Sequence, residues 1–239
     1  MTRAAVFFDL DKTICAVPTE QFLTKHFLQN GIIGKVDVLK ILWGFLKYNL
    51  HLIPDYTIFR KQLILSIMQG MKVFDCEQAI QYTFENVLRS KIYPGIIEEI
   101  KKHQQQNRKI VIISTAINKI VEVFAKELKA DYHYSTDIEV VENTFSGNII
   151  GVVYHGHTKR EAVLAYCKQH NINPADCFAY GDYYEDRHMM EAVGNPVAIN
   201  PDKKLYKVAK ERNWRTLNLS FPDVQQKQKL NRDIEILAR

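Results

Sequence analysis

Short apolar runs alternate with longer amphipathic stretches through most of the chain, and this alternation strongly limits the possible folds. The apolar runs lie at Ala4–Asp9, Lys109–Ser114, Asp131–Tyr134, Cys177–Gly181 and Pro196–Ile199. Between several of them lie stretches with helical spacing, at Gly95–Gln106, Ile117–Leu128, Lys159–His170 and Asp186–Ala192. Strands that alternate with helices of about 10 to 15 residues predict an α/β fold, with a parallel sheet covered by helices on both faces.

The stretch VVENTFSGNIIGVVYHG departs from this alternation. Apolar and polar residues alternate within it around Asn143 and Gly147, which is the pattern of a β-hairpin. We therefore expect a doubly wound, Rossmann-like parallel sheet that carries a β-hairpin extension.

Residues 16–89 interrupt the strand and helix alternation. They have helical patterns throughout, with turn signals at Asn30–Gly31, Pro54, Gly70 and Asp75. This arrangement predicts a core of residues 1–15 and 90–215, an inserted helical cap of residues 16–89, and a C-terminal tail of residues 216–239.

One helix of the expected cap, Val38–Ile53, is apolar nearly all round. Its weak polar stripe consists of Lys40, Gly44, Lys47 and His51. A membrane span needs about 20 apolar residues, so two lysines inside this short segment argue against one. We expect core packing or an apolar lid over a pocket, with shallow contact to lipid as the alternative.

The composition is that of a globular protein. Hydrophobic residues make up 46% and charged residues 25% of the 239 residues. The four cysteines, Cys15, Cys76, Cys167 and Cys177, show no metal-type pairing, and no signal peptide is apparent before the first strand. Reduced thiols and a cytoplasmic location are therefore expected.

The net charge of +5 is concentrated near the end of the chain. From Lys203 onward there are ten lysines and arginines against four acidic residues. Such a tail could contact anionic membranes or nucleic acid, but it has no dense basic cluster. A solvated helical surface is the favoured interpretation, and no nucleic-acid partner is expected. The hairpin and Asp223–Arg239 offer surfaces for a dimer, and neither carries a pattern that favours one.

Reactive side chains follow the expected strands where those strands end. They are Asp9 and Asp11 after the first strand, Ser114 and Thr115 after the second, Asp182 and Asp186 after the fourth, and Lys159 at the start of a helix. Ligands bind outside the carboxyl ends of the strands in a doubly wound sheet, so these groups are expected to converge. Clustered carboxylates are unfavourable unless a cation neutralises them, and their hard oxygens indicate Mg²⁺.

This set of groups suits phosphoryl transfer. One carboxylate could attack phosphorus, a second could act as general acid and base, and an ammonium and a hydroxyl could hold the phosphoryl oxygens. Simpler interpretations exist for each residue alone: Asp9 and Asp11 as a turn and a helix cap, Ser114 as an ordinary strand end. Lys159 gains nothing from a helix N-terminus, and a nearby acidic cluster would account for its position. His155 and His157 are expected at the surface or at a pocket rim.

The segments FFDLDKTI, VIISTA, HTKREAV and AYGDYYED resemble the four motifs of the haloacid dehalogenase superfamily. The resemblance is to subfamily IB, the branch with phosphoserine phosphatase-like hydrolases, and it covers most of the chain. It implies a nucleophilic Asp9, an acid/base Asp11, and phosphate binding by Ser114, Thr115 and Lys159. It also implies Mg²⁺ held by Asp9, Asp182, Asp186 and the backbone carbonyl of Asp11. The position of the insertion after the first motif implies a cap of the C1 type.

The chain departs from phosphoserine phosphatases at several positions. Thr115 and Ala116 replace a glycine pair, and Glu20 lies two positions beyond the usual place of the glutamate that binds the substrate ammonium. Further candidates for substrate contact are Arg60, Tyr183 and Tyr184. The expected activity is Mg²⁺-dependent hydrolysis of a small phosphorylated metabolite through an aspartyl phosphate. The alternatives are phosphoryl transfer or mutase activity at the same aspartate, and a non-catalytic member that binds a membrane or partner.

Overall fold

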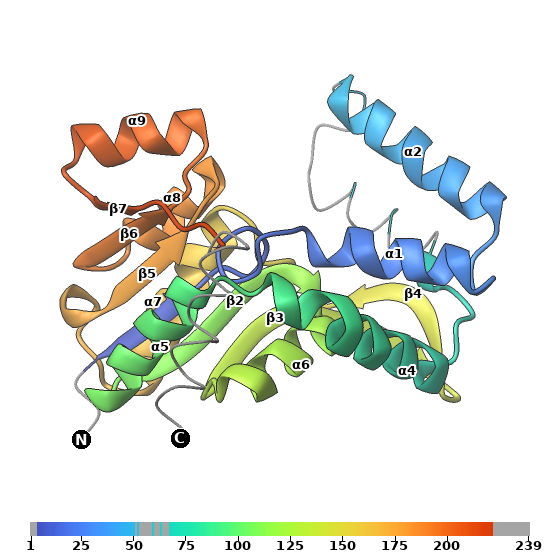
Figure 1. Cartoon of the computed structure of the whole chain (residues 1–239), viewed down its shortest axis with the longest axis horizontal. Helices are drawn as coiled ribbons and strands as arrows, with labels where there is room; N and C mark the ends of the chain where they lie inside the picture. Colours follow the sequence, from blue (N-terminus) through green and yellow to red (C-terminus); the bar gives the residue numbers. More distant parts are fainter. Residues whose placement is uncertain (1–3, 51, 53–58, 60–62, 64–66, 222–239) are drawn as a thin grey trace, which may run out of the picture.

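A seven-stranded sheet with the order β4-β3-β2-β1-β5-β6-β7 forms the centre of the protein (Figure 1). The computed structural model describes residues 4–50, 52, 59, 63 and 67–221. The strands are β1 (Ala5–Phe8), β2 (Lys109–Ile117), β3 (Tyr132–Val141), β4 (Thr144–Ile150), β5 (Phe178–Gly181), β6 (Asn195–Ile199) and β7 (Arg215–Leu217). Neighbouring strands are parallel except β3 and β4, which form an antiparallel hairpin. The predicted α/β fold, with its doubly wound sheet and hairpin extension, is confirmed.

Helices cover both faces of this sheet. They are α5 (Pro94–Gln105), α6 (Asn118–Leu128), α7 (His157–Gln169), α8 (Arg187–Met190) and α9 (Lys203–Glu211). Successive side chains of a strand point to opposite faces, so β1 contributes to two cores. Val6 and Phe8 pack in a cluster with Phe124 of α6, whereas Phe7 packs in a cluster with Val163 of α7. Burial on both faces explains why the strands are continuous apolar runs.

The described residues between β1 and α5 are mainly helical, as predicted. They form α1 (Thr19–Gln29), α2 (Lys35–Asn49) and α4 (Val73–Thr83), followed by a π-helical turn at Phe84–Leu88 and a 3₁₀ turn at Arg89–Lys91. Leu23 of α1 and Ile80 of α4 belong to the same apolar cluster as Val6 and Phe8 of β1. The inserted helices therefore share a core with one face of the sheet. The division into residues 16–89 as cap and 1–15 with 90–215 as core stays a prediction.

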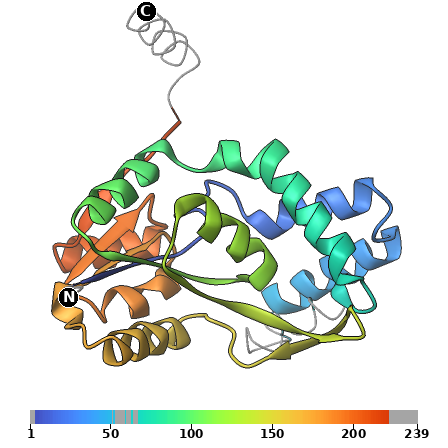
Figure 2. The same cartoon turned by 90° about the horizontal axis from the view of Figure 1, so that it is seen from below.

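The hairpin extends to the inserted segment (Figure 2). Backbone hydrogen bonds join the two. The N–H of Gly70 donates to the carbonyl of Phe145 at 2.8 Å, and the N–H of Phe145 donates to Met71 at 2.9 Å. The N–H of Val73 donates to the carbonyl of Asn143 at 3.0 Å. The tip of the hairpin thus fixes the start of α4.

Several element boundaries differ from the prediction. β2 runs on to Ile117 through a register irregularity after Ile113. The helix expected at Asp186–Ala192 is a 3₁₀ turn at Tyr184–Asp186 followed by α8. β7 was not predicted because three residues carry no distinct apolar run, and the expected boundary at residue 215 falls inside it.

Core packing, one of the uses expected for the apolar helix, does not extend to all of its sides, and a role as a lid over a pocket stays a prediction. Val38 packs against the first core cluster, in agreement with core packing. Leu39, Leu42, Trp43 and Leu46, however, are between 45% and 63% exposed. A helix that is apolar all round needs neighbours on every side to be buried, and the side of α2 that carries these four residues is exposed. His51 and Ile53 of the predicted segment lie outside the described residues. Across the described parts of the chain, no helix is long and apolar enough to cross a membrane.

Candidate active site

The strand order brings three of the predicted side chains to one edge of the sheet. β1 lies between β2 and β5, and all three strands are parallel. Asp9 follows β1 directly, Ser114 lies near the end of β2, and Asp182 follows β5 directly. The N–H of Asp9 donates to the carbonyl of Tyr180 at 3.0 Å, which continues the ladder between β1 and β5. Asp9 and Asp182 are therefore neighbours although they are distant in sequence.

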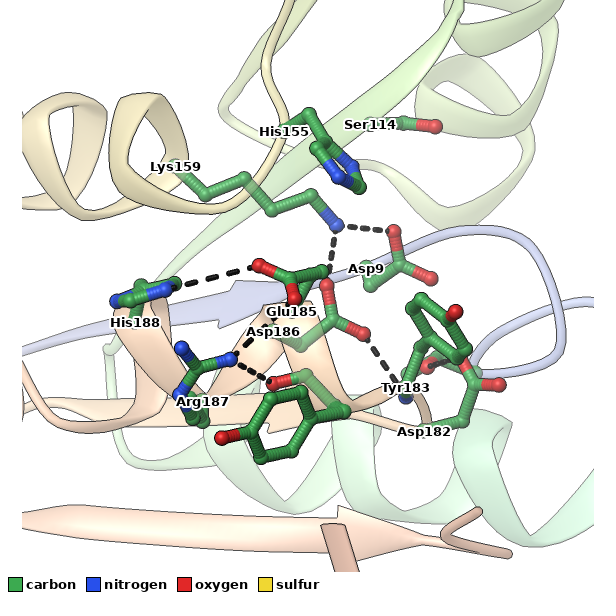
Figure 3. A network of polar contacts seen from close by, with 12 residues as sticks. Asp9, Ser114, His155, Lys159, Asp182, Tyr183, Glu185, Asp186, Arg187 and His188 are labelled. Carbon is green, nitrogen blue, oxygen red and sulfur yellow. Dashed lines mark hydrogen bonds and ion pairs between the residues drawn. The ribbon is translucent and has the colours of Figure 1, made fainter. Parts of the chain in front are cut away.

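Lys159 enters this cluster from the first turn of α7 (Figure 3). Its Nζ donates to Oδ1 of Asp9 at 2.6 Å and to Oδ1 of Asp186 at 2.6 Å. The lysine is only 3% exposed, so both ion pairs are shielded from water. The two carboxylates offset the unfavourable position of a cation at a helix N-terminus, as the sequence indicated.

The loop after β5 holds Asp182 and Asp186 in place. Oγ1 of Thr13 donates to Oδ1 of Asp182 at 3.1 Å. The N–H of Tyr183 donates to Oδ2 of Asp186 at 3.1 Å, and the N–H of Asp186 donates back to the carbonyl of Tyr183 at 2.8 Å. Gly181 permits this tight turn, because a Cβ at its position would lie 2.6 Å from Cβ of Asp186.

Burial makes the ionised carboxylates of this site unfavourable. It raises the pKa of Asp9 to about 7, against the opposing attraction of Lys159. Burial and the charges of Asp9 and Asp186 raise the pKa of Asp182 to about 8. Burial acts to lower the pKa of Lys159, but Asp186 and Asp9 outweigh it and hold that pKa above its ordinary value. The site therefore has an excess of negative charge in a dry environment.

The donor set of this cluster suits a divalent cation. Asp9, Asp182 and Asp186 each offer a carboxylate oxygen, and these oxygens all lie within 4.8 Å of one another. Three ionised carboxylates and the ammonium of Lys159 leave two negative charges, which a divalent ion would neutralise. Oxygen-only donors favour a hard ion such as Mg²⁺ over zinc. The predicted set also included Asp11, through its backbone carbonyl.

The side chain of Asp11 contacts the inserted segment. Its Oδ1 accepts a hydrogen bond from the N–H of Thr19 at 2.8 Å. Thr19 is the first residue of α1, and the preceding Pro18 has no side-chain acceptor for the open N–H groups of this helix. Asp11 therefore caps α1 from outside the helix. The positive φ of 65° at Lys12 turns the chain just after Asp11.

Ser114 lies beside the cluster, on the side of Lys159 and His155 (Figure 3). It is 1% exposed, and its Oγ accepts a hydrogen bond from the N–H of Ala116 at 3.1 Å. The carbonyl of Thr115 accepts a hydrogen bond from Oγ1 of Thr136 at 2.7 Å. These bonds fix the end of β2 beside the carboxylates.

The predicted substrate-contact residues are dispersed. Oε1 of Glu20 accepts a hydrogen bond from the N–H of Ile117 at 3.1 Å, so this carboxylate joins α1 to the end of β2. Tyr183 is 54% exposed, although its backbone touches Asp186. Arg60 lies outside the described residues. A cavity of about 910 Å³ lies among α1, α2 and α4, with His26, Asp37 and Tyr82 in its wall, and it does not include the carboxylate cluster.

Several polar residues near the cluster were not predicted. Thr13 is fully buried against Asp182. Its hydroxyl, in the same loop as Asp9 and Asp11, is the sequence feature that could have indicated it. Glu185 accepts from Arg187 at 3.4 Å and lies 3.6 Å from Nε2 of His188 (Figure 3). These three residues belong to the turn and helix after Asp182. In the sequence each is an isolated charged or titratable residue with no pattern that indicates a contact. His155 is half-buried, as a residue at a pocket rim would be. Burial lowers the pKa of its imidazole, and the positive charge of Lys159 lowers it further.

Comparison with known proteins places the chain in a family. A family model described as haloacid dehalogenase-like hydrolase matches residues 6–191. The chain belongs to this family. The predictions of the superfamily and of an enzyme are therefore confirmed, and this hydrolase has relatives named phosphatases.

Two relatives align with most of this hydrolase. The "Inhibition of morphological differentiation protein" of Streptomyces azureus is 30% identical over 93% of this chain and 80% of its own length. "Phosphoserine phosphatase SerB1" of Mycobacterium tuberculosis is 27% identical over 88% of this chain and 69% of its own length. A solved structure described as a phospho-aspartyl intermediate analogue of phosphoserine phosphatase has a TM-score of 0.66 and 19% identity, and the match covers 96% of this chain and 99% of that one. The structural match supports the fold.

Proposed function

We propose that this hydrolase is a Mg²⁺-dependent phosphomonoesterase that forms an aspartyl phosphate on Asp9. The observation that carries the proposal is the buried cluster in which Lys159 bridges Asp9 and Asp186 at 2.6 Å, with Asp182 alongside. The phosphatase names of its relatives support the same class of substrate. The proposed substrate is a small phosphorylated metabolite.

In the first half of the reaction, Asp9 acts as the nucleophile. One of its carboxylate oxygens forms a bond to phosphorus while the bond from phosphorus to the alcohol oxygen of the substrate breaks. Lys159 stays protonated and faces the oxygens of the transferring group, and Ser114 and Thr115 bind that group from the end of β2. These donors are fixed before the substrate arrives, so little reorganisation is needed during the reaction.

Asp9, Asp182 and Asp186, with the backbone carbonyl of Asp11, would hold Mg²⁺. The bound ion would neutralise the excess negative charge of the carboxylates and the negative charge of the phosphoryl oxygens. Metal ions make this contribution in many enzymes that transfer phosphoryl groups. Thr13 orients Asp182 for this purpose. The raised pKa values of Asp9 and Asp182 fit carboxyl groups that become fully ionised when a cation binds.

Asp11 would transfer the protons. It donates one to the alcohol oxygen that leaves phosphorus, and it later accepts one from the water that attacks the aspartyl phosphate. That second step releases inorganic phosphate and restores the Asp9 carboxylate. In the described structure Oδ1 of Asp11 accepts a hydrogen bond from the N–H of Thr19, so the carboxyl group that would transfer the proton also caps α1.

The cap contacts bear on substrate choice. Glu20, which lies two positions beyond the usual place of the glutamate that binds a substrate ammonium in phosphoserine phosphatases, is hydrogen-bonded to the backbone of Ile117. This contact does not favour an amino-acid phosphate over other small phosphomonoesters. A cytoplasmic location stays a prediction of the sequence.

The experiment that tests the proposal is hydrolysis of p-nitrophenyl phosphate by the purified full chain. We expect release of phosphate that depends on added Mg²⁺ and stops with EDTA. Asp9→Asn should abolish the release while the protein keeps its thermal transition. Asp176→Asn, at an exposed aspartate away from the site, serves as the matched control and should react like the wild type.

Two results would contradict the proposal. One is full turnover by Asp9→Asn, because the proposal assigns the nucleophile to Asp9. The other is transfer of the phosphoryl group to an added alcohol with no inorganic phosphate formed, which would assign the chain to the phosphotransferases.

A further inference from the structure

α2 presents a continuous row of large apolar side chains to the surrounding solvent. Val36 is 64% exposed, Leu39 63%, Leu42 59%, Trp43 56% and Leu46 45%. Leu50 and Leu52, just after the helix, are 58% and 68% exposed. Exposed apolar residues are normal when they are scattered, whereas a contiguous group usually marks a site of interaction.

The spacing of these residues makes them one face of the helix. At about 100° per residue, the positions of Val36, Leu39, Leu42, Trp43 and Leu46 fall within an arc of roughly 120°. Leu50 continues the same arc one turn later. Val38 lies about 40° beyond Leu42, just outside this arc, and packs against the core. We call the outward group of Val36, Leu39, Leu42, Trp43, Leu46 and Leu50 the apolar stripe.

Positive charges border the apolar stripe. On the helical wheel, Lys40 and Lys47 fall at one edge of it, and Lys47 lies 5.5 Å from the ring centre of Trp43. α2 contains Asp37 as its one acidic residue, and Lys40 pairs with it at 3.1 Å. Lysines can extend along apolar surface while their ammonium groups stay in water, and tryptophan prefers the boundary between apolar and polar surroundings.

A lipid surface fits both features of this face together. Hydrocarbon would receive the leucines and the valine, and anionic headgroups would meet the lysines. α2 is also well placed for such contact, because it is an outer element of the inserted segment on the side away from the sheet (Figure 1).

We propose that the apolar stripe docks this hydrolase on an anionic bilayer, with α2 lying in the plane of the interface. The proposal does not depend on the proposed reaction. It assigns α2 a peripheral contact, since the described helices include none that could span a membrane.

Fluorescence of Trp43 tests the contact directly. The chain holds two tryptophans, so Trp214→Phe leaves Trp43 as the single reporter. With vesicles of phosphatidylcholine and phosphatidylglycerol, we expect its emission to shift to shorter wavelength and brominated acyl chains to quench it. Phosphatidylcholine alone should produce a weaker response, because it lacks the negative charge.

Vesicle co-sedimentation of variants tests the residues. Leu39→Gln, Leu42→Gln and Leu46→Gln together should lower partition at least tenfold. The matched control exchanges three exposed apolar residues elsewhere, Phe74→Gln, Val140→Gln and Val152→Gln, and should sediment like the wild type. Lys40→Gln with Lys47→Gln should weaken binding to anionic vesicles only.

Three outcomes would overturn the proposal. They are no response of Trp43 to anionic vesicles, unchanged sedimentation of the leucine variant, and a dimer of the wild type that the leucine variant abolishes. The last would assign the apolar stripe to a second copy of this chain. Hydrolysis of p-nitrophenyl phosphate by the leucine variant, expected to equal that of the wild type, separates docking from the chemistry.

Discussion

At the scale of single residues, the proposed chemistry depends on one buried ammonium among three carboxylates. Lys159 is 3% exposed and contacts both Asp9 and Asp186. Removal of one partner from such a group leaves the other charges buried and unpaired, which is more damaging than loss of an exposed ion pair.

We therefore expect Lys159→Met to damage activity and stability together. Phosphate release should fall by about 100-fold or more, because the donor that faces the phosphoryl oxygens is lost. In Mg²⁺-free buffer the free energy of unfolding should fall by about 3 to 5 kcal/mol. Both are measured on purified protein, by turnover and by denaturant unfolding. Lys168→Met, at an exposed lysine of the same helix, is the control, and equal behaviour of the two variants would show that Lys159 has no special role.

Gly181 gives a second test at this scale. A Cβ there would lie 2.6 Å from Cβ of Asp186, so Gly181→Ala should force the loop after β5 out of position. We expect a loss of about 1 to 3 kcal/mol in the free energy of unfolding and weaker Mg²⁺ binding. At Gly44, within α2, the nearest atom to an added Cβ lies 3.8 Å away, so Gly44→Ala should be neutral or stabilising. The prediction is wrong if Gly181→Ala unfolds like the wild type.

At the scale of elements, two carboxylates join α1 to the strand ends. Asp11 caps α1 at Thr19, and Glu20 of α1 accepts a hydrogen bond from the N–H of Ile117 at the end of β2. Each link connects the inserted segment to a loop of the candidate site. Movement of this segment would therefore move groups that are proposed to handle protons and phosphate.

The capping and proton-transfer roles of Asp11 can be separated by two substitutions. Asp11→Asn keeps an acceptor oxygen for the N–H of Thr19, so it should unfold like the wild type. Its turnover should still fall by about 100- to 10,000-fold, because an amide cannot transfer the proton. Asp11→Ala should lose the same activity and, in addition, about 1 kcal/mol of stability. Normal turnover by Asp11→Asn would remove Asp11 from the mechanism.

The parts of the site that could be predicted are those set by topology. Asp9 and Asp182 follow two parallel strands, and Ser114 lies near the end of a third. Parallel strands end at one edge of a sheet, so position in the chain was sufficient. The orientation of the Asp11 side chain could not be predicted in this way, because its sequence context agrees with both a catalytic role and a helix cap. The observed bond to Thr19 depends on where α1 begins relative to the loop.

The exposure of the apolar stripe could not be predicted for a related reason. A helix that is apolar all round has the same sequence whether it is buried or lies against another surface. Only packing shows that Val38 faces the core while Leu39 and Leu42 face outward. β7 was missed because a three-residue strand has too few positions to show a period.

At the scale of the whole molecule, the buried carboxylates couple stability to pH and to Mg²⁺. Burial in the folded protein raises the pKa of Asp9 to about 7 and that of Asp182 to about 8, above the ordinary value of 3.8 for an aspartate. A raised pKa means that the folded state binds protons more tightly than the unfolded state. The corresponding stability is fully present below pH 3.8 and is lost as pH rises through about 7 to 8.

Mg²⁺ should counter this loss, because it replaces the protons. We expect the rise in melting temperature on adding Mg²⁺ to be larger at about pH 8 than at about pH 5.5, since fewer protons then compete with the ion. Thermal unfolding at both pH values, with and without the ion, measures the difference. Asp182→Asn should remove most of it. An equal shift at both pH values would show that Mg²⁺ does not bind at these carboxylates.

The central claim is that Asp9 carries the phosphoryl group during turnover. Its most direct test is rapid acid quenching of the full chain during hydrolysis of a phosphomonoester with Mg²⁺, followed by mass spectrometry of its peptides. We expect one added phosphoryl group on the peptide that contains Asp9. This group should be lost on treatment with hydroxylamine and should be missing in Asp9→Asn. Steady turnover with that peptide never modified, or with the group on another residue, would contradict the account.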